Sequence, residues 1–271
     1  DEDLSRGLGD VYKRQLKAID DTTFYPSKGK ERLKSMIETR PDWCVSRQRV
    51  WGVPLPIFVN KKTKEILVDD KVNENIASIY EKEGSDCWFS DDPQRFLGNK
   101  YKAEDYDKLS DIVEVWFDSG STHSFVLEKR EDLKWPASMY LEGSDQHRGW
   151  FHSSLLESCG TRGKAPFESI LSHGFVVDGK GLKMSKSLGN VIAPEDILKK
   201  YGADILRIWV ASSNYAEDLR IDYSILDQHS ESYRKIRNTF RYLLGNLNDK
   251  FEEIDLENIK IEDFQELEQL M

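Results

Sequence analysis

The chain has 271 residues, which at about 150 residues per domain corresponds to one or two domains and leaves ample length for a buried core. Hydrophobic residues make up 38% and charged residues 32%, and 39 basic against 49 acidic residues give a net charge of −10. As a whole, the chain is therefore too acidic for general binding to nucleic acids or anionic membranes. The sequence shows neither an apolar run of the ~18 residues of a membrane span nor a signal-peptide core, so we expect a cytoplasmic protein.

The cysteines and histidines do not predict a metal site. Cys44, Cys87 and Cys159 lie far apart and form no Cys-x-x-Cys pair, which favours neither a disulfide framework nor a zinc site. His147 and His152 do not have the i, i+4 spacing of a helical metal pair. We therefore expect no metal ligand in this chain.

The first forty residues change character along their length. Residues 1–15 mix charges and glycines without helical spacing, so we expect an unplaced tail that the natural protein need not share. Further on, Leu33, Met36 and Ile37 share one face of a predicted helix.

The next part of the chain divides into an extended run and, over residues 60–110, what looks like an insertion. Residues 40–59 form a strand-like run whose glycine and prolines confine it to a sheet edge or an extended loop. Over residues 60–110 we predict a turn at Asn60–Thr63, a helix from Asn73 to Lys82 and a loop over 84–94.

From Asp111 onward the pattern becomes that of an α/β fold. Strands alternating with helices predict a mainly parallel sheet, whose ligands bind beyond the carboxyl ends of the strands. The predicted strands cover residues 112–117, 138–141 and 170–177, and the predicted helices begin after a cap at Ser144 or Asp145, at Pro194 and at Asp204.

A last helix is predicted over residues 231–247. One stripe of it is apolar, and the other face carries Arg234, Lys235, Arg237 and Arg241. This basic face could contact a nucleic-acid backbone or form an ordinary solvated surface. Residues 249–271 then carry nine acids and two lysines, so −7 of the net charge lies beyond the basic helix.

The loop DGKGLKMSKSLGN, residues 178–190, is a candidate site for ATP phosphates. Lys183 and Lys186 lie three residues apart beside Ser185, between glycines that allow the backbone to approach a phosphate. Their ammonium groups can neutralise the charge that spreads over a triphosphate as it is cleaved. The spacing is not that of a P-loop, and a mobile solvated lysine loop is the alternative.

The turn EGSDQHRGW, residues 142–150, is a second candidate site because many polar groups crowd a predicted strand-to-helix turn. Glu142 could accept a hydrogen bond from a substrate ammonium, and Asp145 or Gln146 could hold ribose hydroxyls. Asp145 could also cap the helix. A Ser-His-Asp triad is disfavoured because the turn lacks a Gly-x-Ser-x-Gly elbow.

Two tryptophans, Trp116 and Trp150, lie next to the predicted strand ends. An indole wall there could select an aliphatic side chain by packing, although tryptophan is more often part of a core.

These residues together resemble the class I aminoacyl-tRNA synthetases, and among them most closely the isoleucine-specific enzymes. The matching runs are DWCVSRQRVWGVPLPIF, EVWFDSGS, YLEGSDQHRGWF, SHGFVVDGKGLKMSKSLGNVIAPEDILKKYGADILRIWV and YRKIRNTFRYLLGNL. The KMSKS run points to the class, and EGSDQHRGWF favours isoleucine over valine and leucine. The alternatives are a valyl or leucyl enzyme, or a non-catalytic tRNA-binding module derived from a synthetase.

The resemblance implies that isoleucine and ATP, with Mg²⁺, give isoleucyl-adenylate and pyrophosphate, after which the adenylate acylates tRNA(Ile). In that reaction Glu142 would contact the adenylate's amino group, with the following turn around the ribose and aminoacyl part. The implied turn residues are Gly143, Asp145, Gln146 and His147. Trp116 and Trp150 would form walls of the isoleucine pocket, and Lys186, helped by Lys183 and Ser185, would hold ATP.

The resemblance also implies what this chain lacks. The His-Ile-Gly-His half of the nucleotide-binding fold and the editing domain find no counterpart, and any zinc of the family lies outside the chain. We therefore expect a fragment of a monomeric full-length enzyme that is inactive alone.

The expected fold class is α/β, with the C-terminal half of a Rossmann-like catalytic domain followed by the start of an α-helical anticodon-binding domain. The expected parts are a tail over 1–15, a segment over 16–60 that follows the missing editing domain, an inserted connective segment over 61–110, the half-domain over 111–226 and the truncated helical domain over 227–271.

Overall fold

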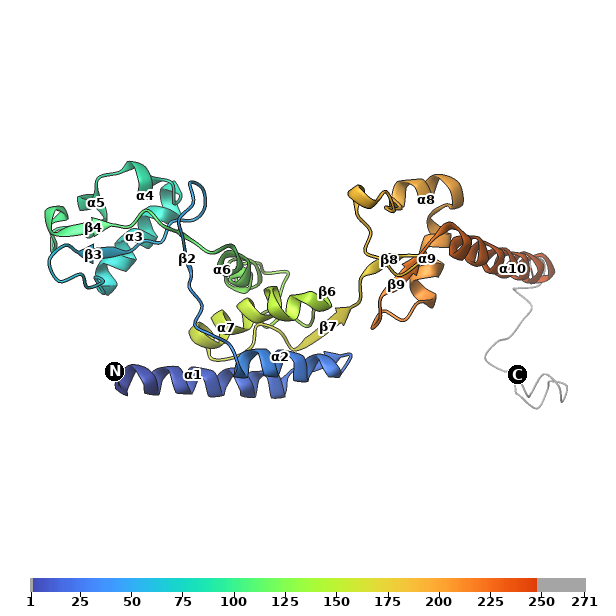
Figure 1. The fold of residues 1–271 in the computed structure, drawn as a ribbon, viewed down its shortest axis with the longest axis horizontal. Helices are drawn as coiled ribbons and strands as arrows, with labels where there is room; N and C mark the ends of the chain where they lie inside the picture. Colours follow the sequence, from blue (N-terminus) through green and yellow to red (C-terminus); the bar gives the residue numbers. More distant parts are fainter. Residues whose placement is uncertain (1, 248–271) are drawn as a thin grey trace. The chain divides into compact units, whose positions relative to one another are not determined.

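The computed structural model describes residues 2–247, which divide after His173 into two compact units (Figure 1). The acidic run over 249–271, with the end of the expected anticodon-binding domain, lies outside the described residues. Over the described part of the chain, no helix is long and apolar enough to cross a bilayer.

A three-stranded parallel sheet is the centre of the first unit. Strand β7 (Ser169–His173) lies between β1 (Thr23–Tyr25) and β6 (Tyr140–Gly143). Ile170 pairs with Phe24 on one side and with Tyr140 on the other. The parallel sheet expected from the sequence is therefore confirmed, and it recruits β1, a strand that the sequence pattern does not predict.

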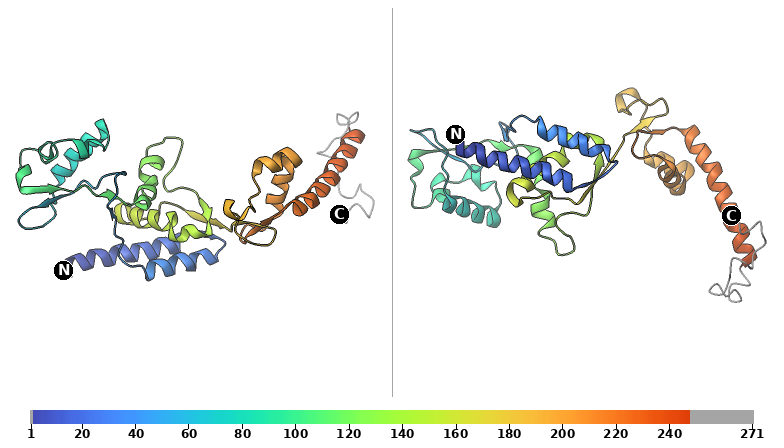
Figure 2. Two further views of the ribbon diagram at one scale, coloured as in Figure 1. Left: turned by 45° about the horizontal axis from the view of Figure 1, so that its top comes forward. Right: turned by 90° about the horizontal axis from the view of Figure 1, so that it is seen from below.

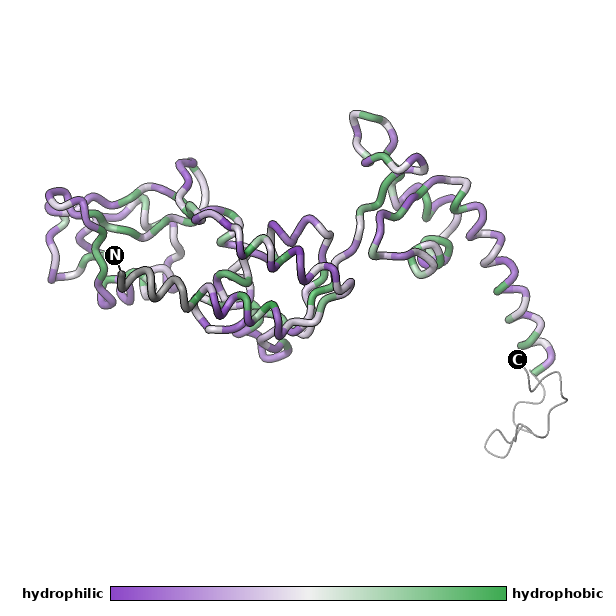
Figure 3. Tube along the Cα trace, turned by 60° about the horizontal axis from the view of Figure 1, so that its bottom comes forward, coloured by the Kyte–Doolittle hydropathy of each residue, from purple (hydrophilic) through white to green (hydrophobic). Residues whose placement is uncertain are grey.

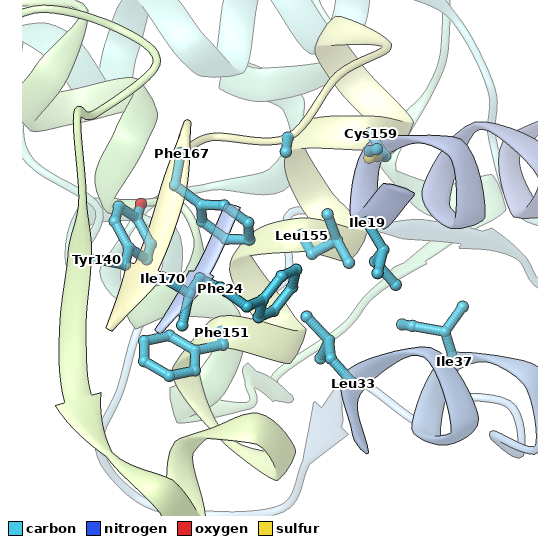
Figure 4. Close-up of a cluster of buried hydrophobic side chains, with 12 residues drawn as sticks. Ile19, Phe24, Leu33, Ile37, Tyr140, Phe151, Leu155, Cys159, Phe167 and Ile170 are labelled. Atoms are coloured by element: carbon cyan, nitrogen blue, oxygen red, sulfur yellow. The ribbon is translucent and has the colours of Figure 1, made fainter. Parts of the chain in front are cut away.

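Helices cover this sheet and enclose its core. α1 (Glu2–Asp21) and α2 (Lys28–Glu38) pack side by side, and α1 also contacts α7 (Trp150–Arg162) (Figure 2). The buried side chains come from all these elements, and Figure 4 shows them converging. They include Ile19, Phe24, Leu33, Ile37, Tyr140, Phe151, Leu155, Cys159, Phe167 and Ile170.

The structure differs from the expected tail over residues 1–15. Residues from Glu2 onward belong to α1, whose last turns bury Ala18 and Ile19 in the core. Tyr12 and Leu16 also pack against that core. The spacing of residues 1–15 does not predict a helix. The contacts that the later apolar residues of α1 make with the core stabilise it instead.

A second, separate core lies over residues 58–109. Here β3 (Phe58–Asn60) pairs antiparallel with β4 (Tyr106–Lys108). The predicted turn at Asn60 is confirmed, since its Oδ1 accepts hydrogen bonds from the backbone of Lys62 and Thr63. The helices of this segment are α3 (Asp70–Glu83), α4 (Cys87–Ser90), α5 (Pro93–Leu97) and the 3₁₀ turn η1 (Ala103–Asp105).

The helix of this segment is longer than predicted because of its cap. The Asp69 carboxylate accepts hydrogen bonds from the backbone N–H groups of Lys71 and Val72, so α3 begins three residues before Asn73. Trp88, fully buried, packs on Phe58 and Phe96 at ring distances of 5.1 and 4.9 Å. The predicted loop over 84–94 contains α4 and the start of α5.

The predicted buried strand over residues 112–117 is wrong. Only β5 (Ile112–Val113) is a strand, paired antiparallel with β2 (Ser46–Arg47), and α6 (Val115–Gly120) follows at once. The carboxylate of Glu114 caps this helix by accepting a hydrogen bond from the backbone N–H of Trp116 at 3.0 Å. Val115 and Trp116 are 66% and 41% exposed, so the apolar run is not a buried one. A π-helical turn, η2 (His123–Leu127), comes next.

The second unit, described over residues 174–247, has its own small core. β8 (Val176–Asp178) pairs in parallel with β9 (Leu219–Ile221), and α8 (Pro194–Tyr201) and α9 (Ala203–Ser212) match the two predicted helices. Its buried side chains are Ile197, Ile205, Trp209, Ile221 and Leu226.

The expected single strand over 170–177 is in fact two strands. The break falls at Gly174, where a Cβ would overlap the backbone of Glu217. The backbone N–H of Phe175 donates to the Asp218 carboxylate at 2.8 Å rather than to a neighbouring strand. Close approach of two backbones thus interrupts the ladder.

The last helix, α10 (Tyr223–Leu247), begins eight residues before the predicted start at Glu231. Asp222 explains the difference, because its carboxylate accepts a hydrogen bond from the backbone N–H of Ile225 at 2.8 Å. Polar and apolar residues alternate along the helix (Figure 3). Among the described residues its apolar stripe is mostly exposed, at Ile236, Phe240, Leu243 and Leu244.

The central strand yields a prediction for stability. Ile170 is fully buried at the middle of the sheet, so Ile170→Ala is expected to lower the free energy of unfolding of the first unit by about 2–5 kcal/mol. Urea denaturation measures this. Ile66→Ala, at a side chain that is 58% exposed in the same unit, is the control and should change it by less than about 1 kcal/mol. Equal losses for the two variants would contradict the assignment of the core.

Candidate functional site

The first candidate site is the turn that follows β6 at the carboxyl edge of the parallel sheet. Glu142 is exposed there and pairs in register with Ser172 of β7, while Gly143 is buried. A 3₁₀ turn, η3 (Ser144–Arg148), connects the strand to α7. The strand-to-helix turn predicted from the sequence is thus confirmed.

Gln146, rather than Ser144 or Asp145, caps the following helix. Its Oε1 accepts a hydrogen bond from the backbone N–H of Trp150 at 3.0 Å, and its Nε2 donates to the Asp145 carboxylate at 2.9 Å. The predicted cap at Ser144 or Asp145 is therefore wrong, because the intervening 3₁₀ turn places Gln146 next to the first turn of α7. The exposed Asp145 carboxylate keeps acceptor capacity for a ligand.

His147 lies beneath this turn and not on its surface. Its side chain is buried, and Nδ1 donates to the backbone carbonyl of Ser144 at 2.8 Å. Burial lowers the pKa of His147, and Nε2 faces Gly29 of α2 without a hydrogen-bond partner in the described part of the chain. Direct contact with a ribose, as expected from the sequence, does not fit this placement, and His147 instead supports the turn from below.

The two candidate wall tryptophans meet at the start of α7. The Trp150 ring stacks on Tyr140 with centroids 4.0 Å apart, and its Nε1 donates to the backbone carbonyl of Ser119 in α6 at 2.8 Å. The edge of Trp116 lies against Gly149, 3.1 Å from the position that a Cβ would take. A side chain at residue 149 would overlap Oε1 of Gln146 first and would also crowd Trp116.

Trp116 also lines a cavity of about 200 Å³ that does not include Trp150. The cavity combines an apolar wall with charged groups. Burial, and next the charges of Arg40 and Arg148, lower the pKa of His152 to about 4. Its lining residues are Arg40, Pro41, Asp42, Trp43, Trp116, Arg148, Gly149, His152, Ser153 and Leu156.

A carboxyl group lies between the two helices that carry these tryptophans. Glu157 of α7 lies so close to Gly120 of α6 that a Cβ there would overlap its Oε1, which is buried without a partner among the described residues. Burial, and next the charge of Asp118, raise the pKa of Glu157 to about 8. Near neutral pH, α6 therefore packs on a protonated Glu157.

The second candidate site is the loop between β8 and α8, in the other unit. Lys183 and Lys186 are exposed, and neither forms an ion pair with any residue the structure describes. The Ser185 hydroxyl accepts a hydrogen bond from the backbone N–H of Leu188 at 3.3 Å, which caps the short turn η4 (Lys186–Leu188). Sequence reasoning places this loop correctly at a strand end.

The basic face of α10 is confirmed as an exposed surface. Arg234 bonds Glu231 of the same helix at 3.1 Å. Lys235, Arg237 and Arg241 are exposed, and within residues 2–247 none of them forms an ion pair. Three cations thus remain available to a polyanion.

Four residues that bear on these sites escape the sequence analysis. Tyr140 stacks on Trp150 and Glu157 packs against Gly120 of α6, contacts that no local pattern reveals. Asp178 and Asn190 close the lysine loop, and the signal that could have found them is the presence of a carboxylate and an amide at the two ends of a glycine-rich loop.

Comparisons with known proteins show which family this chain matches. The family model for class I tRNA synthetases (I, L, M and V) matches residues 8–222. The chain is 86% identical over 259 residues to the isoleucine--tRNA ligase of Pelagibacter ubique, which covers 96% of the chain and 29% of that protein. It is 54% identical over 272 residues to the isoleucine--tRNA ligase of Brucella abortus, covering 99% of the chain and 27% of that protein. The chain thus spans less than a third of these relatives.

Solved structures share the fold at lower identity. The Agrobacterium radiobacter LeuRS–tRNA–LeuAMS complex matches with a TM-score of 0.56 and 22% identity over 82% of this chain and 30% of that one. Mycobacterium tuberculosis methionyl-tRNA synthetase bound to methionyl-adenylate matches with a TM-score of 0.51 and 18% identity over 80% of this chain and 34% of that one.

The buried Glu157 predicts how stability depends on pH. Because folding raises the pKa of Glu157 from 4.5 to about 8, the folded state holds a proton that the unfolded state releases, and stability falls as the pH rises through this interval. Glu157→Gln keeps the shape and removes the titration. We expect it to raise the free energy of unfolding by about 1–2 kcal/mol near pH 9, after allowance for solvent screening, and to change it little near pH 5.

Denaturation curves across this pH range measure the effect. Glu131→Gln, at an exposed carboxyl of the same unit, is the matched control and should follow the parent chain at each pH. A Glu157→Gln variant with the same pH slope as the parent would contradict the buried protonated carboxyl.

Proposed function

Because the chain belongs to the family of class I tRNA synthetases, we propose that it is part of an isoleucine-specific enzyme that activates isoleucine with ATP and transfers it to tRNA(Ile). The observation that carries this proposal is the 86% identity to an isoleucine--tRNA ligase along 96% of the chain. A valine- or leucine-specific enzyme is a weaker candidate, because the relative with this identity is named for isoleucine.

In this proposal the turn after β6 binds the aminoacyl-adenylate. The exposed carboxylate of Glu142 accepts a hydrogen bond from the substrate's ammonium group, and Gly143 lets the backbone approach it. Asp145 holds ribose hydroxyls, while Gln146 fixes the turn by capping α7. The position of each group is set before substrate arrives, which reduces the entropy lost on reaching the reactive geometry.

The tryptophans give the pocket its preference for an aliphatic side chain. Trp150 is held by stacking on Tyr140 and by its hydrogen bond to the Ser119 carbonyl, while Trp116 lies with its edge against Gly149 and is 41% exposed. Packing of this kind separates isoleucine from valine by only ~10²-fold, because the two differ by one methylene group.

Lys183 and Lys186 act on the triphosphate. As the α-phosphate is attacked by the isoleucine carboxylate, negative charge grows on the departing pyrophosphate, and two ammonium groups stabilise it electrostatically. The Ser185 hydroxyl holds the short turn Lys186–Leu188 by accepting the backbone N–H of Leu188. The reaction needs neither a covalent enzyme intermediate nor a side chain acting as general base.

The exposed cations of α10, with Arg234 beside them, are proposed to contact the tRNA backbone. An enzyme of this kind works in the cytoplasm, as a monomer, and uses ATP with Mg²⁺. No cluster of carboxylates or histidines in residues 2–247 could hold a metal ion, so in this proposal Mg²⁺ arrives bound to ATP.

Activity is best measured in a chimera in which this chain replaces the matching segment of the Pelagibacter ubique ligase. Lys186→Ala should lower the rate of isoleucine-dependent ATP–pyrophosphate exchange by about 10²-fold or more, the scale of removing one transition-state donor. Lys199→Ala, which removes an exposed lysine from α8, is the control and should leave the rate unchanged. An unchanged rate for Lys186→Ala would overturn the role of the loop.

The proposed tRNA contacts predict a change in salt dependence. Replacing Arg237 and Arg241 together with alanine should weaken tRNA binding at low salt and reduce the slope of log affinity against log salt by about one for each lost phosphate contact. Filter binding across a salt series measures both quantities. If the slope of the double variant equals that of the parent, α10 does not contact the tRNA backbone.

A further inference from the structure

One side chain, that of Asn190, closes the loop from which Lys183 and Lys186 project. Its Oδ1 accepts a hydrogen bond from the backbone N–H of Ser185 at 2.9 Å. Its Nδ2 donates to the Asp178 carboxylate at 2.9 Å and to the backbone carbonyl of Lys183 at 3.2 Å. Because one side offers a donor and the other only acceptors, a single orientation of the amide satisfies all three.

Asp178 fixes the opposite end of the same loop. Its Oδ1 accepts hydrogen bonds from the backbone N–H groups of Lys180 and Leu182, at 3.0 and 2.8 Å, while Oδ2 accepts from Asn190. The hydrogen bond from Asn190, and next that from the Leu182 backbone, lower the pKa of Asp178. The pair therefore joins the two ends of the loop and holds its middle.

The base of the loop rests on fixed parts of the second unit. Asp178 ends β8, and Val177 forms an isolated bridge with Lys183. Gly179 lies against Asp222, the residue that caps α10, so closely that a Cβ would overlap its carboxylate. The backbone of the loop is thus anchored, while both lysine side chains stay exposed.

We propose that Asn190, with Asp178 as its partner, is a positioning residue that holds Lys183 and Lys186 in the geometry in which they act on the triphosphate. This proposal rests on the proposed function. Asn190 acts through the backbone of Ser185 and Lys183 and touches no phosphate itself. Without the Asn190 side chain, the segment between the two lysines can adopt many conformations. The two ammonium groups are then less often in position to stabilise pyrophosphate.

The chemistry of the pair allows a reciprocal test. Asn190→Asp places two carboxylates opposite each other, and Asp178→Asn leaves two amides that cannot both face their backbone partners. The double exchange restores one carboxylate and one amide. The carboxylate at position 190 then accepts from the Ser185 N–H and from the amide at 178, whose oxygen still accepts from Lys180 and Leu182. The bond to the Lys183 carbonyl is lost and a carboxylate oxygen faces that carbonyl oxygen instead, so the exchange restores the loop in part.

Hydrogen exchange in the full 271-residue chain tests the pair without any activity. We expect the amide of Ser185 to exchange roughly tenfold or more faster in each single variant, and to return to within about threefold of the parent in the double variant. Asn214→Asp, the same substitution in the same unit, is the matched control, because this side chain only accepts a bond, from the Ala216 N–H. Unchanged exchange in Asn190→Asp, or no recovery in the double variant, would overturn the pair.

Pyrophosphate exchange in the chimera tests the consequence. Each single variant should lower kcat by roughly tenfold or more while the KM for isoleucine stays within about twofold, and the double variant should recover most of kcat. A general loss of structure would also speed hydrogen exchange at amides far from the loop, and it would not be rescued in the double variant. Unchanged kcat in the single variants overturns the positioning role. A parent chimera without pyrophosphate-exchange activity overturns the proposed function instead. Amide hydrogen exchange then still tests whether Asn190 and Asp178 hold the loop.

Discussion

The parallel pairing of β7 with β1 and β6 is the constraint on which the first unit depends. Parallel strands send their carboxyl ends to one edge, so the turn after β6 emerges at that edge, where Glu142 and Asp145 are exposed. The same pairing buries Ile170 and Tyr140. Tyr140 in turn supplies the surface on which Trp150 stacks, which ties this tryptophan directly to the sheet.

In each unit, bonds between side chains and backbone fix the parts that strand pairing leaves free. Gln146 caps α7, Glu114 caps α6 and Asn190 closes the lysine loop, each with an oxygen that accepts a backbone N–H. Such bonds compete well with water only where the neighbouring backbone is already held. Both candidate sites thus combine exposed charged groups with an anchored backbone, as electrostatic catalysis requires.

The sequence predicts those features that have a local signal. The helix after Pro194 carries its own start and stop signals and the turn at Asn60 carries its own acceptor, so each is found where expected. The strand over 112–117 fails because an apolar run alone does not distinguish a buried strand from an exposed helix that Glu114 caps. The strand β1 and the residues of α1 form through contacts distant in the sequence.

The residues of the candidate sites also divide into those that a local sequence signal predicts and those that it does not. The positions of Glu142 and of the two lysines follow from motif and strand end together. The burial of His147 under Gly29 does not, because it depends on α2, more than a hundred residues earlier in the chain. The sequence does not predict the raised pKa of Glu157 either, because it results from burial against α6 and then from the charge of Asp118.

Amino-acid specificity tests the central claim, that this chain forms the isoleucine-binding part of a synthetase, most directly. The measurement is the rate of ATP–pyrophosphate exchange by the chimera with isoleucine, valine, leucine or methionine as the only amino acid. The account predicts that isoleucine gives the highest kcat/KM, with valine lower by about 10²-fold. Equal or greater kcat/KM with valine, leucine or methionine would contradict it.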